Sequence, residues 1–367
     1  MLAVRTAVLA CLLLAACDGN PFAVGAGDPD PDPTPGNPSV STLPGTENPS
    51  ANRSISRFEE HGKGPNSANN GDGTAGSGGS APAVLGNGFA FQDGKIHYNA
   101  ADDTFAVDNL AFDGGNVYVR SSAFGDADVV NDIGPARLYE GAGTVPDNQT
   151  GALIDQFSYR ALYGVSKNDG RTSFAIVRTG AYIPYGFGGF IYTRRGGVGF
   201  PVLEPGSNQA KYTGAYAGLR DFDGQGGLQV TSGKMELTID FNDFNADESG
   251  LDMASGVTGG VFDRQVFDLA GNDITDSVIA EINADRGTSL TELPELRLFT
   301  GPGFMDSNGE SEGYIANFPD GVEFETGKYY AILAGDKADE VVGIIVINSD
   351  IGTVTTRETG GFILYRP

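Results

Sequence analysis

The chain offers few side chains for acid–base, nucleophilic or zinc chemistry. Its 367 residues include two histidines, His61 and His97, and two cysteines, Cys11 and Cys17. A zinc site needs several histidine, cysteine or carboxylate ligands that converge on one ion. A Ser-His-Asp triad would depend on His97 alone, and we interpret this histidine as a structural or surface residue of a strand. We therefore expect no zinc centre and no cofactor.

Two acidic stretches place oxygen-bearing side chains two residues apart and include a glycine. They are Asp221–Gln225 (DFDGQ) and Asp306–Glu310 (DSNGE). An EF-hand loop is longer and ends on a distal glutamate, which neither stretch supplies. Asn308-Gly309 also suits a type I′ turn. We interpret both stretches as turns, with calcium binding as the open second interpretation.

Paired carboxylates, which glycosidases use, can occur in any acidic β protein. The chain has 48 Asp and Glu residues, and their spacing singles out no pair. Such a hydrolase needs a cleft with two carboxylates about 5–9 Å apart. A carboxylate-dependent hydrolase is therefore kept only as an alternative to a non-catalytic role.

The N-terminus has the features of a bacterial export signal. Arg5 precedes the apolar run Ala7–Ala16, which is too short to span a bilayer as a helix. The run leads into Leu-Ala-Ala-Cys at 14–17, which resembles the lipobox of bacterial lipoproteins. The resemblance implies that residues 1–16 are a signal peptide and that Cys17 is the lipidation site. Two or three acyl chains together would give a stable membrane attachment.

Charge and composition narrow the expected partners. The formal net charge is −25 and the isoelectric point about 4.2, so the phosphate backbone of a nucleic acid would be repelled. The acidic residues are spread along the chain, which favours a role in solubility over recognition of a cationic partner. Loss of Cys11 with the signal peptide and lipidation of Cys17 would leave no thiol for a disulfide. The expected partners are a membrane, through the lipid, and an unknown protein or small-solute ligand.

Residues 17–82 lack the apolar content of a folded domain. Proline, aspartate, serine, asparagine and glycine dominate them, and such a segment cannot bury enough surface to offset its ordering entropy. We predict a disordered tether of about 65 residues, which would span roughly 45 Å as a coil. The folded part would then be held away from the membrane.

From residue 83 on, short period-two stretches alternate with turns rich in Asn, Asp and Gly. Phe105 and Val107, for example, alternate with smaller or polar neighbours. Asp169-Gly170 predicts the turn of a hairpin between two strands. We assign residues 83–207 to an N-terminal β domain.

Residues 208–367 contain the clearest strand pattern. Met235, Leu237 and Ile239 fall on one face of a strand, with polar residues on the other. The apolar strand Val341–Ile347 would be an aggregation hazard at an open sheet edge. Many short strands and a need for closure favour a barrel or sandwich.

One helix is predicted, from about Asp276 to Arg286. Val278, Ile279 and Ile282 form its apolar stripe. Thr275 or Asp273 can cap its start, and Gly287 ends it. We expect this helix to close one end or side of the sheet.

Three stretches of the second half resemble a known family of lipoprotein barrels. They are KYTGAYAGLRDFDGQGGLQVTSGKMELTIDFND at 211–243, GDKADEVVGIIVI at 335–347 and GGFILYRP at 360–367. They are similar to segments of transferrin-binding protein B and factor H binding protein. The resemblance implies an eight-stranded barrel, a handle-like β domain before it, and a non-enzymatic role in binding a host protein or small solute.

We therefore expect an all-β chain: an N-terminal handle-like β domain and, over residues 208–367, an eight-stranded antiparallel β-barrel with one short helix. The expected function is non-catalytic binding by a lipid-anchored envelope protein, and a structural or surface-coat lipoprotein without a specific ligand is the alternative. The outer membrane is the expected location. Asp18, beside the anchor, resembles the signal that retains some enteric lipoproteins in the inner membrane.

The most distinctive loop is AYIPYGFGGFIY at 181–192. Tyr182, Tyr185 and Phe187 cluster there around a proline and glycines. If exposed, they would form an aromatic anchor of the type that dominates binding interfaces. If buried, they would pack the seam between the two β units. Both interpretations stay open, and these three residues are the candidate ligand-binding site.

Overall fold

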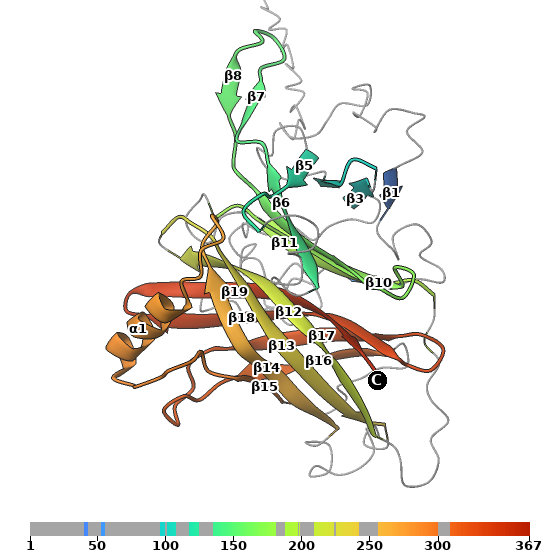
Figure 1. The fold of residues 1–367 in the computed structure, drawn as a ribbon, viewed down its shortest axis with the longest axis vertical. Coiled ribbons are helices and arrows are strands. Elements are labelled where there is room, and N and C mark those ends of the chain that lie inside the picture. The colour runs from blue at the N-terminus through green and yellow to red at the C-terminus, as the bar shows by residue number, and fades with distance from the viewer. Residues whose placement is uncertain are drawn as a thin grey trace, which may run out of the picture. The chain divides into compact units, whose positions relative to one another are not determined.

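The computed structural model describes residues 40–42, 53–55, 96–99, 101–107, 117–124, 135–180, 188–196, 198, 209–223, 225–241, 256–299 and 309–367. The predicted signal peptide, Cys17, Tyr182, Tyr185 and Phe187 lie outside these residues. Within them the chain is all-β, as expected. It forms a closed barrel, an open nine-stranded sheet, a two-stranded hairpin and one helix (Figure 1).

Eight antiparallel strands form the barrel, and they follow one another in chain order. Their bounds are β12 Gln209–Asp223, β13 Gln229–Asp240, β14 Val257–Phe267, β15 Leu296–Phe299, β16 Glu310–Ala316, β17 Thr326–Ala334, β18 Glu340–Ile351 and β19 Val354–Tyr365. The last strand pairs with the first along the register Thr213↔Tyr365 to Asp223↔Thr355. This closure confirms the expected barrel. It also places the apolar stretch of β18 between β17 and β19, where both strand edges are paired.

Alternation along the strands separates the lumen of the barrel from its outer wall. Met235, Leu237 and Ile239 of β13 are buried in the lumen, whereas the residues between them are partly exposed. The predicted half-buried strand is therefore confirmed. The same alternation continues around the barrel, because a period of two is fixed by the pleat.

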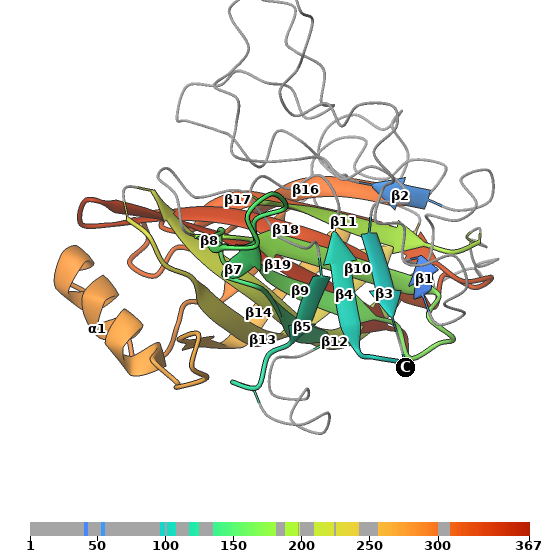
Figure 2. The same cartoon turned by 90° about the horizontal axis from the view of Figure 1, so that it is seen from above.

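The helix α1 spans Thr275–Arg286 and lies at one end of the barrel (Figures 1 and 2). Val278, Ile279 and Ile282 pack against a cluster that includes Val266 of β14. The apolar stripe and the left-handed Gly287 at the C-terminal end (φ 66°) are as expected.

The start of the helix differs from the expected cap. The Asp273 carboxylate accepts a hydrogen bond from the Thr275 N–H over 2.9 Å, but Ile274 occupies the cap position and makes no side-chain cap bond. The Thr275 hydroxyl instead accepts a hydrogen bond from the Val266 N–H over 2.9 Å. Thr275 therefore connects the helix to β14 through its hydroxyl, and Ile274 occupies the N-terminal cap position.

The second sheet has nine strands in the order β1-β3-β4-β5-β6-β9-β10-β11-β2. Their bounds are β1 Val40–Thr42, β3 Ile96–Asn99, β4 Thr104–Val107, β5 Val117–Arg120, β6 Ala136–Gly141, β9 Arg160–Val165, β10 Thr172–Arg178, β11 Gly188–Arg194 and β2 Arg53–Ile55. The edge strands β1 and β2 come from the stretch 17–82 that was expected to be a tether. β9 and β10 form the predicted hairpin, with positive φ at Asp169 and Gly170. The small hairpin of β7 (Thr144–Pro146) and β8 (Leu153–Asp155) projects beyond this sheet (Figure 1).

One face of this sheet packs on the barrel. Phe174 and Ile176 of β10 share a buried cluster with Leu219, Ile344 and Ile363 of the barrel wall. The other face of the sheet carries a second core rich in tyrosine and phenylalanine. β10 lies between the two cores, and each of its seven residues is buried. Both faces of β10 are therefore buried, including its polar residues Thr172, Ser173 and Arg178.

Candidate functional site

Side chains fill the apolar part of the barrel lumen. Three aromatic rings in the lumen lie against glycines, which leave room for them: Tyr216 at Gly360, Phe362 at Gly343 and Tyr329 at Gly313. A Cβ atom at Gly360 would lie 2.1 Å from the Tyr216 ring. The glycines of these strands therefore make room for aromatic side chains in a packed interior.

A network of charges occupies the lumen at the end nearer α1. The Arg264 guanidinium donates to both Glu325 oxygens, over 2.5 and 3.0 Å, and to Glu358 over 3.1 Å. The Tyr216 hydroxyl donates to Glu358 over 2.7 Å. Burial opposes charge on Glu325, but the Arg264 guanidinium outweighs it and holds the pKa of Glu325 below its usual value. The network is a structural ion-pair cluster, because its groups bond to one another and are withdrawn from solvent.

Polar contacts also join the nine-stranded sheet to the barrel. The buried Glu340 carboxylate accepts hydrogen bonds from Ser166 over 2.8 Å, from Asn168 over 2.7 Å and from the Thr172 hydroxyl.

Asp221 accepts two hydrogen bonds from Arg357, over 3.1 and 2.8 Å. Asp221 is thus held in a buried ion pair, and Asp221–Asp223 form the end of strand β12 where the sequence predicted a turn. Most of the other calcium candidate, 306–308, lies outside the described residues.

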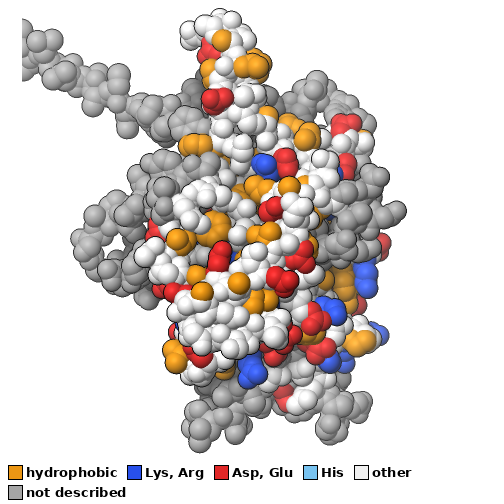
Figure 3. Space-filling model, turned by 60° about the vertical axis from the view of Figure 1, so that its left-hand side comes forward, with side chains coloured by type: hydrophobic (Ala, Val, Ile, Leu, Met, Phe, Trp, Pro, Cys, Tyr) orange, Lys and Arg blue, Asp and Glu red, His pale blue; other side chains and the backbone are white. Residues whose placement is uncertain are grey.

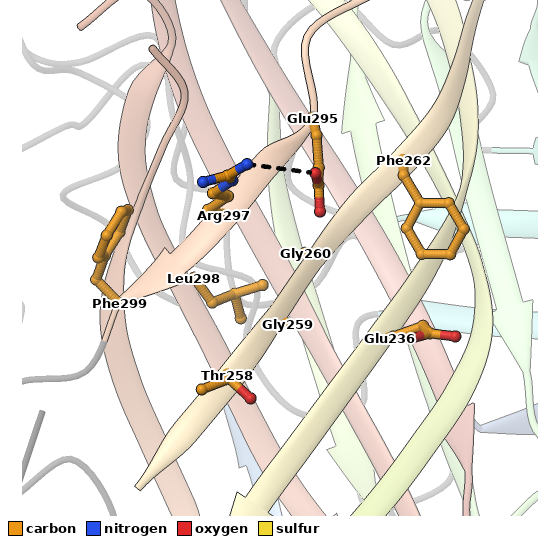
Figure 4. Close-up of a pocket in the computed structure, with 9 residues that line it drawn as sticks. All are labelled: Glu236, Thr258, Gly259, Gly260, Phe262, Glu295, Arg297, Leu298 and Phe299. Atoms are coloured by element: carbon orange, nitrogen blue, oxygen red, sulfur yellow. Dashed lines mark ion pairs between the residues drawn. The ribbon is translucent and has the colours of Figure 1, made fainter. Parts of the chain in front are cut away.

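The outer wall of the barrel has a hollow where β14 and β15 diverge. β13 pairs with β14 from Val230↔Phe267 to Ile239↔Val257. β14 pairs with β15 at Gly260↔Arg297 and Val261↔Leu296 alone. The register stops at Gly259, whose φ of +145° favours glycine. Beyond it lies a hollow of about 310 Å³ (Figure 4). Its lining residues are Glu236, Thr258, Gly259, Gly260, Phe262, Glu295, Arg297, Leu298 and Phe299.

The two carboxylates of the hollow are exposed and paired with cations. Glu236 lies 2.8 Å from Lys211, and Glu295 lies 3.9 Å from Arg297. The side chains of Glu236 and Glu295 are 42% and 50% exposed. A glycosidase raises the pKa of one carboxyl group by burial. The hollow therefore lacks the buried carboxyl group of such a site.

Three exposed aromatic rings adjoin the hollow: one on β15, one on β16 and one just after β16. Phe299, Tyr314 and Phe318 are 39%, 39% and 44% exposed. The Phe299 ring centroid lies 5.8 Å from that of Tyr314 and 6.3 Å from that of Phe318. The barrel residues buried under the nine-stranded sheet come from β12, β13, β17, β18 and β19. We call the hollow and these three rings the β14–β16 surface.

Charge is distributed widely over the described surface. On the face seen in Figure 3, carboxylates are spread among single apolar side chains, with basic side chains between them. This agrees with the even spread of acidic residues along the sequence. No helix among the described residues combines the length and apolar character needed to cross a membrane.

The sequence did not single out the residues of the β14–β16 surface. The candidate residues Tyr182, Tyr185 and Phe187 lie outside the described residues, and His97 lies in β3, opposite Ala106 of β4. A signal for Phe299 was present, since Leu296 and Leu298 face the lumen and alternation turns Phe299 outward. Alternation does not reveal, however, where the pairing of two strands ends.

No protein-family model and no curated protein sequence matches the chain. Among solved structures, it is similar to a transferrin-binding protein B double mutant from Haemophilus parasuis, with a TM-score of 0.35 and 11% identity over 73% of this chain and 44% of that one. Transferrin-binding protein B from Neisseria meningitidis gives 0.31 and 12%, over 76% of this chain and 51% of that one. A putative outer membrane protein from Bacteroides fragilis gives 0.21 and 9%, over 74% and 87%. The chain thus spans about half the length of the transferrin-binding proteins that it matches, and likeness at these TM-scores carries no argument about ligand or activity.

Proposed function

We propose that the chain is a lipid-anchored protein of the bacterial cell envelope that binds a partner protein, without turnover, through the β14–β16 surface. The observation that carries this proposal is the cluster of Phe299, Tyr314 and Phe318 beside the hollow. The cluster lies on the part of the barrel wall that the nine-stranded sheet leaves uncovered.

The residue types of this surface support a protein ligand. Aromatic residues and arginine are enriched among the residues that dominate binding energy at protein interfaces, and Arg297 lies beside Phe299 on the same strand. Contiguous exposed aromatic groups on a soluble protein commonly mark an interaction site. The filled lumen further favours recognition at the outer wall over capture of a small solute inside the barrel.

The N-terminal sequence supports the envelope location. Leu-Ala-Ala-Cys at 14–17 follows an apolar run of signal-peptide length. A lipid on Cys17 would hold the folded part at a membrane through the stretch that precedes β3. Labelled palmitate should be incorporated by the native chain and not by Cys17→Ala. Equal incorporation by both would contradict the anchor.

The binding role is tested by photo-crosslinking in the native host. Benzoylphenylalanine replaces Tyr314 in one variant and Asn348, which is exposed on β18, in a control. We expect irradiation to give a discrete adduct with one partner from position 314 and none from position 348. Absence of an adduct at 314, or the same adducts at both positions, would contradict the proposal.

A further inference from the structure

At the opening between β14 and β15, backbone groups of both strands extend beyond the register that pairs the described residues of the two strands. The Asp240 N–H donates to the Gly256 C=O over 2.9 Å, which makes these two residues a hydrogen-bonded pair of the β13–β14 ladder. Such pairs alternate with non-bonded pairs in an antiparallel ladder. The N–H and C=O groups of Val257 and Gly259 therefore face away from β13, toward the opening.

The same alternation applies to β15. The backbone N–H and C=O groups of Val261 face the same side of β14 as those of Gly259. The N–H and C=O groups of its partner Leu296 therefore face β14, and those of Leu298, two residues further on, face the same side. The register of the described strands stops before Leu298 and Gly259 meet. The backbone N–H and C=O groups at one end of β14 and of β15 therefore face the same hollow, in a wall whose other neighbouring strands are paired.

We propose that an extended, cationic segment of the partner protein lies in this opening and pairs its backbone with the free edges of β14 and β15. This inference rests on the proposed binding function and names how the partner is recognised. Unpaired strand edges recruit further strands, because each added N–H···O bond satisfies a polar group on both sides. Phe299 at the rim offers a ring face for a lysine or arginine side chain.

The negative net charge of the chain favours a cationic segment, rather than a second copy of the chain, as the occupant of the opening. Two copies with a formal net charge of −25 each would repel one another, whereas the same field attracts a cationic segment. Glu236 and Glu295 line the hollow, and their present ion pairs are exposed ones that contribute little. A lysine or arginine of the partner can therefore replace Lys211 or Arg297 as the cation paired with these carboxylates.

The test uses the full chain and a fluorescent peptide of three Lys-Val repeats, which is long enough to cover the roughly 10 Å edge Val257–Gly259. The matched peptide carries N-methyl groups on its lysine residues, which remove backbone donors and keep every charge. We expect anisotropy titrations to give at least tenfold weaker binding for the N-methylated peptide. A Glu-Val peptide of the same length should not bind.

Two variants locate the binding. Thr258→Trp fills the hollow from an exposed strand position and should weaken binding of the Lys-Val peptide at least tenfold. Asn348→Trp, at an exposed position on β18, should leave it unchanged. Equal affinity for the N-methylated peptide, equal loss in both variants, or a native dimer that Thr258→Trp makes monomeric would overturn the inference. An adduct at position 314 together with equal N-methyl affinity would retain the binding function and reject strand pairing.

Discussion

The barrel and the nine-stranded sheet handle charged residues in different ways. In the barrel, the side chains of Arg264, Glu325 and Glu358 are 3%, 7% and 2% exposed. In the sheet, Asp103 receives hydrogen bonds from two tyrosines and ion pairs from Arg120 and Arg137, yet its side chain is 38% exposed. The barrel encloses this network in its lumen, whereas the network around Asp103 on the open sheet remains in contact with water.

The two regions also differ in how they complete their cores. The barrel closes its ladder on itself and fills its own lumen. The nine-stranded sheet is open, and one of its faces is buried only because barrel residues cover it. The proposed binding surface therefore lies on the barrel wall that the sheet leaves uncovered, whereas the buried face of the sheet depends on the wall that it covers.

The largest effect is expected from breaking the ion network in the lumen. Arg264→Leu removes the cation that bonds to both Glu325 oxygens and leaves Glu358 with Arg220 as its buried cation. The free energy of unfolding should therefore fall by about 3–5 kcal/mol. Arg297→Leu, at an exposed position of β15, should change it by less than about 0.5 kcal/mol. Urea denaturation of both variants measures the difference. Similar small losses in both would show that the network does not hold the barrel together.

A somewhat smaller loss is expected at the contact between the two regions. The Phe174 ring packs against Gly164 of β9 and Gly361 of β19, and Phe174→Ala should destabilise the fold by about 3 kcal/mol. Phe318→Ala, on an exposed side chain, is the matched control and should cost below about 1 kcal/mol. If thermal unfolding gave the two variants the same midpoint, the shared core would not couple sheet and barrel.

The smallest effect is a pH dependence in the sheet. Burial raises the pKa of Asp103, but hydrogen bonds from Tyr139 and Tyr98 and the charges of Arg120 and Arg137 outweigh it, so the pKa is lowered. The stabilisation from Asp103 is therefore complete above its unfolded pKa of about 4 and is lost as the pH falls through the folded value.

The measurement compares the native chain with Asp103→Asn between pH 7 and pH 3. The native chain should be more stable at pH 7, and the difference should shrink below about pH 4. Asp155→Asn, on the exposed strand β8, is the matched control for the removal of one carboxylate. A difference that is constant with pH would contradict a role for the ionised carboxylate.

Local patterns in the sequence determined much of this fold. The alternation of Met235, Leu237 and Ile239 and the stripe of α1 follow from neighbouring residues, and both were predicted. The Arg264–Glu325 pair joins residues 61 positions apart, so no local pattern reveals it. The opening beside Gly259 depends on where two strands separate, which is a property of the assembled barrel.

The most direct test of the account is residue-resolved amide hydrogen exchange in the full chain, followed by NMR. Val261 pairs with Leu296, whereas Leu298 faces the opening. We expect the Leu298 and Gly259 amides to exchange at least a hundredfold faster than the Val261 and Leu296 amides. Addition of the Lys-Val peptide should slow exchange at Leu298 and Gly259. Equal protection of all four amides in the free chain would mean that the wall is closed, and the proposed recognition by strand pairing would be wrong.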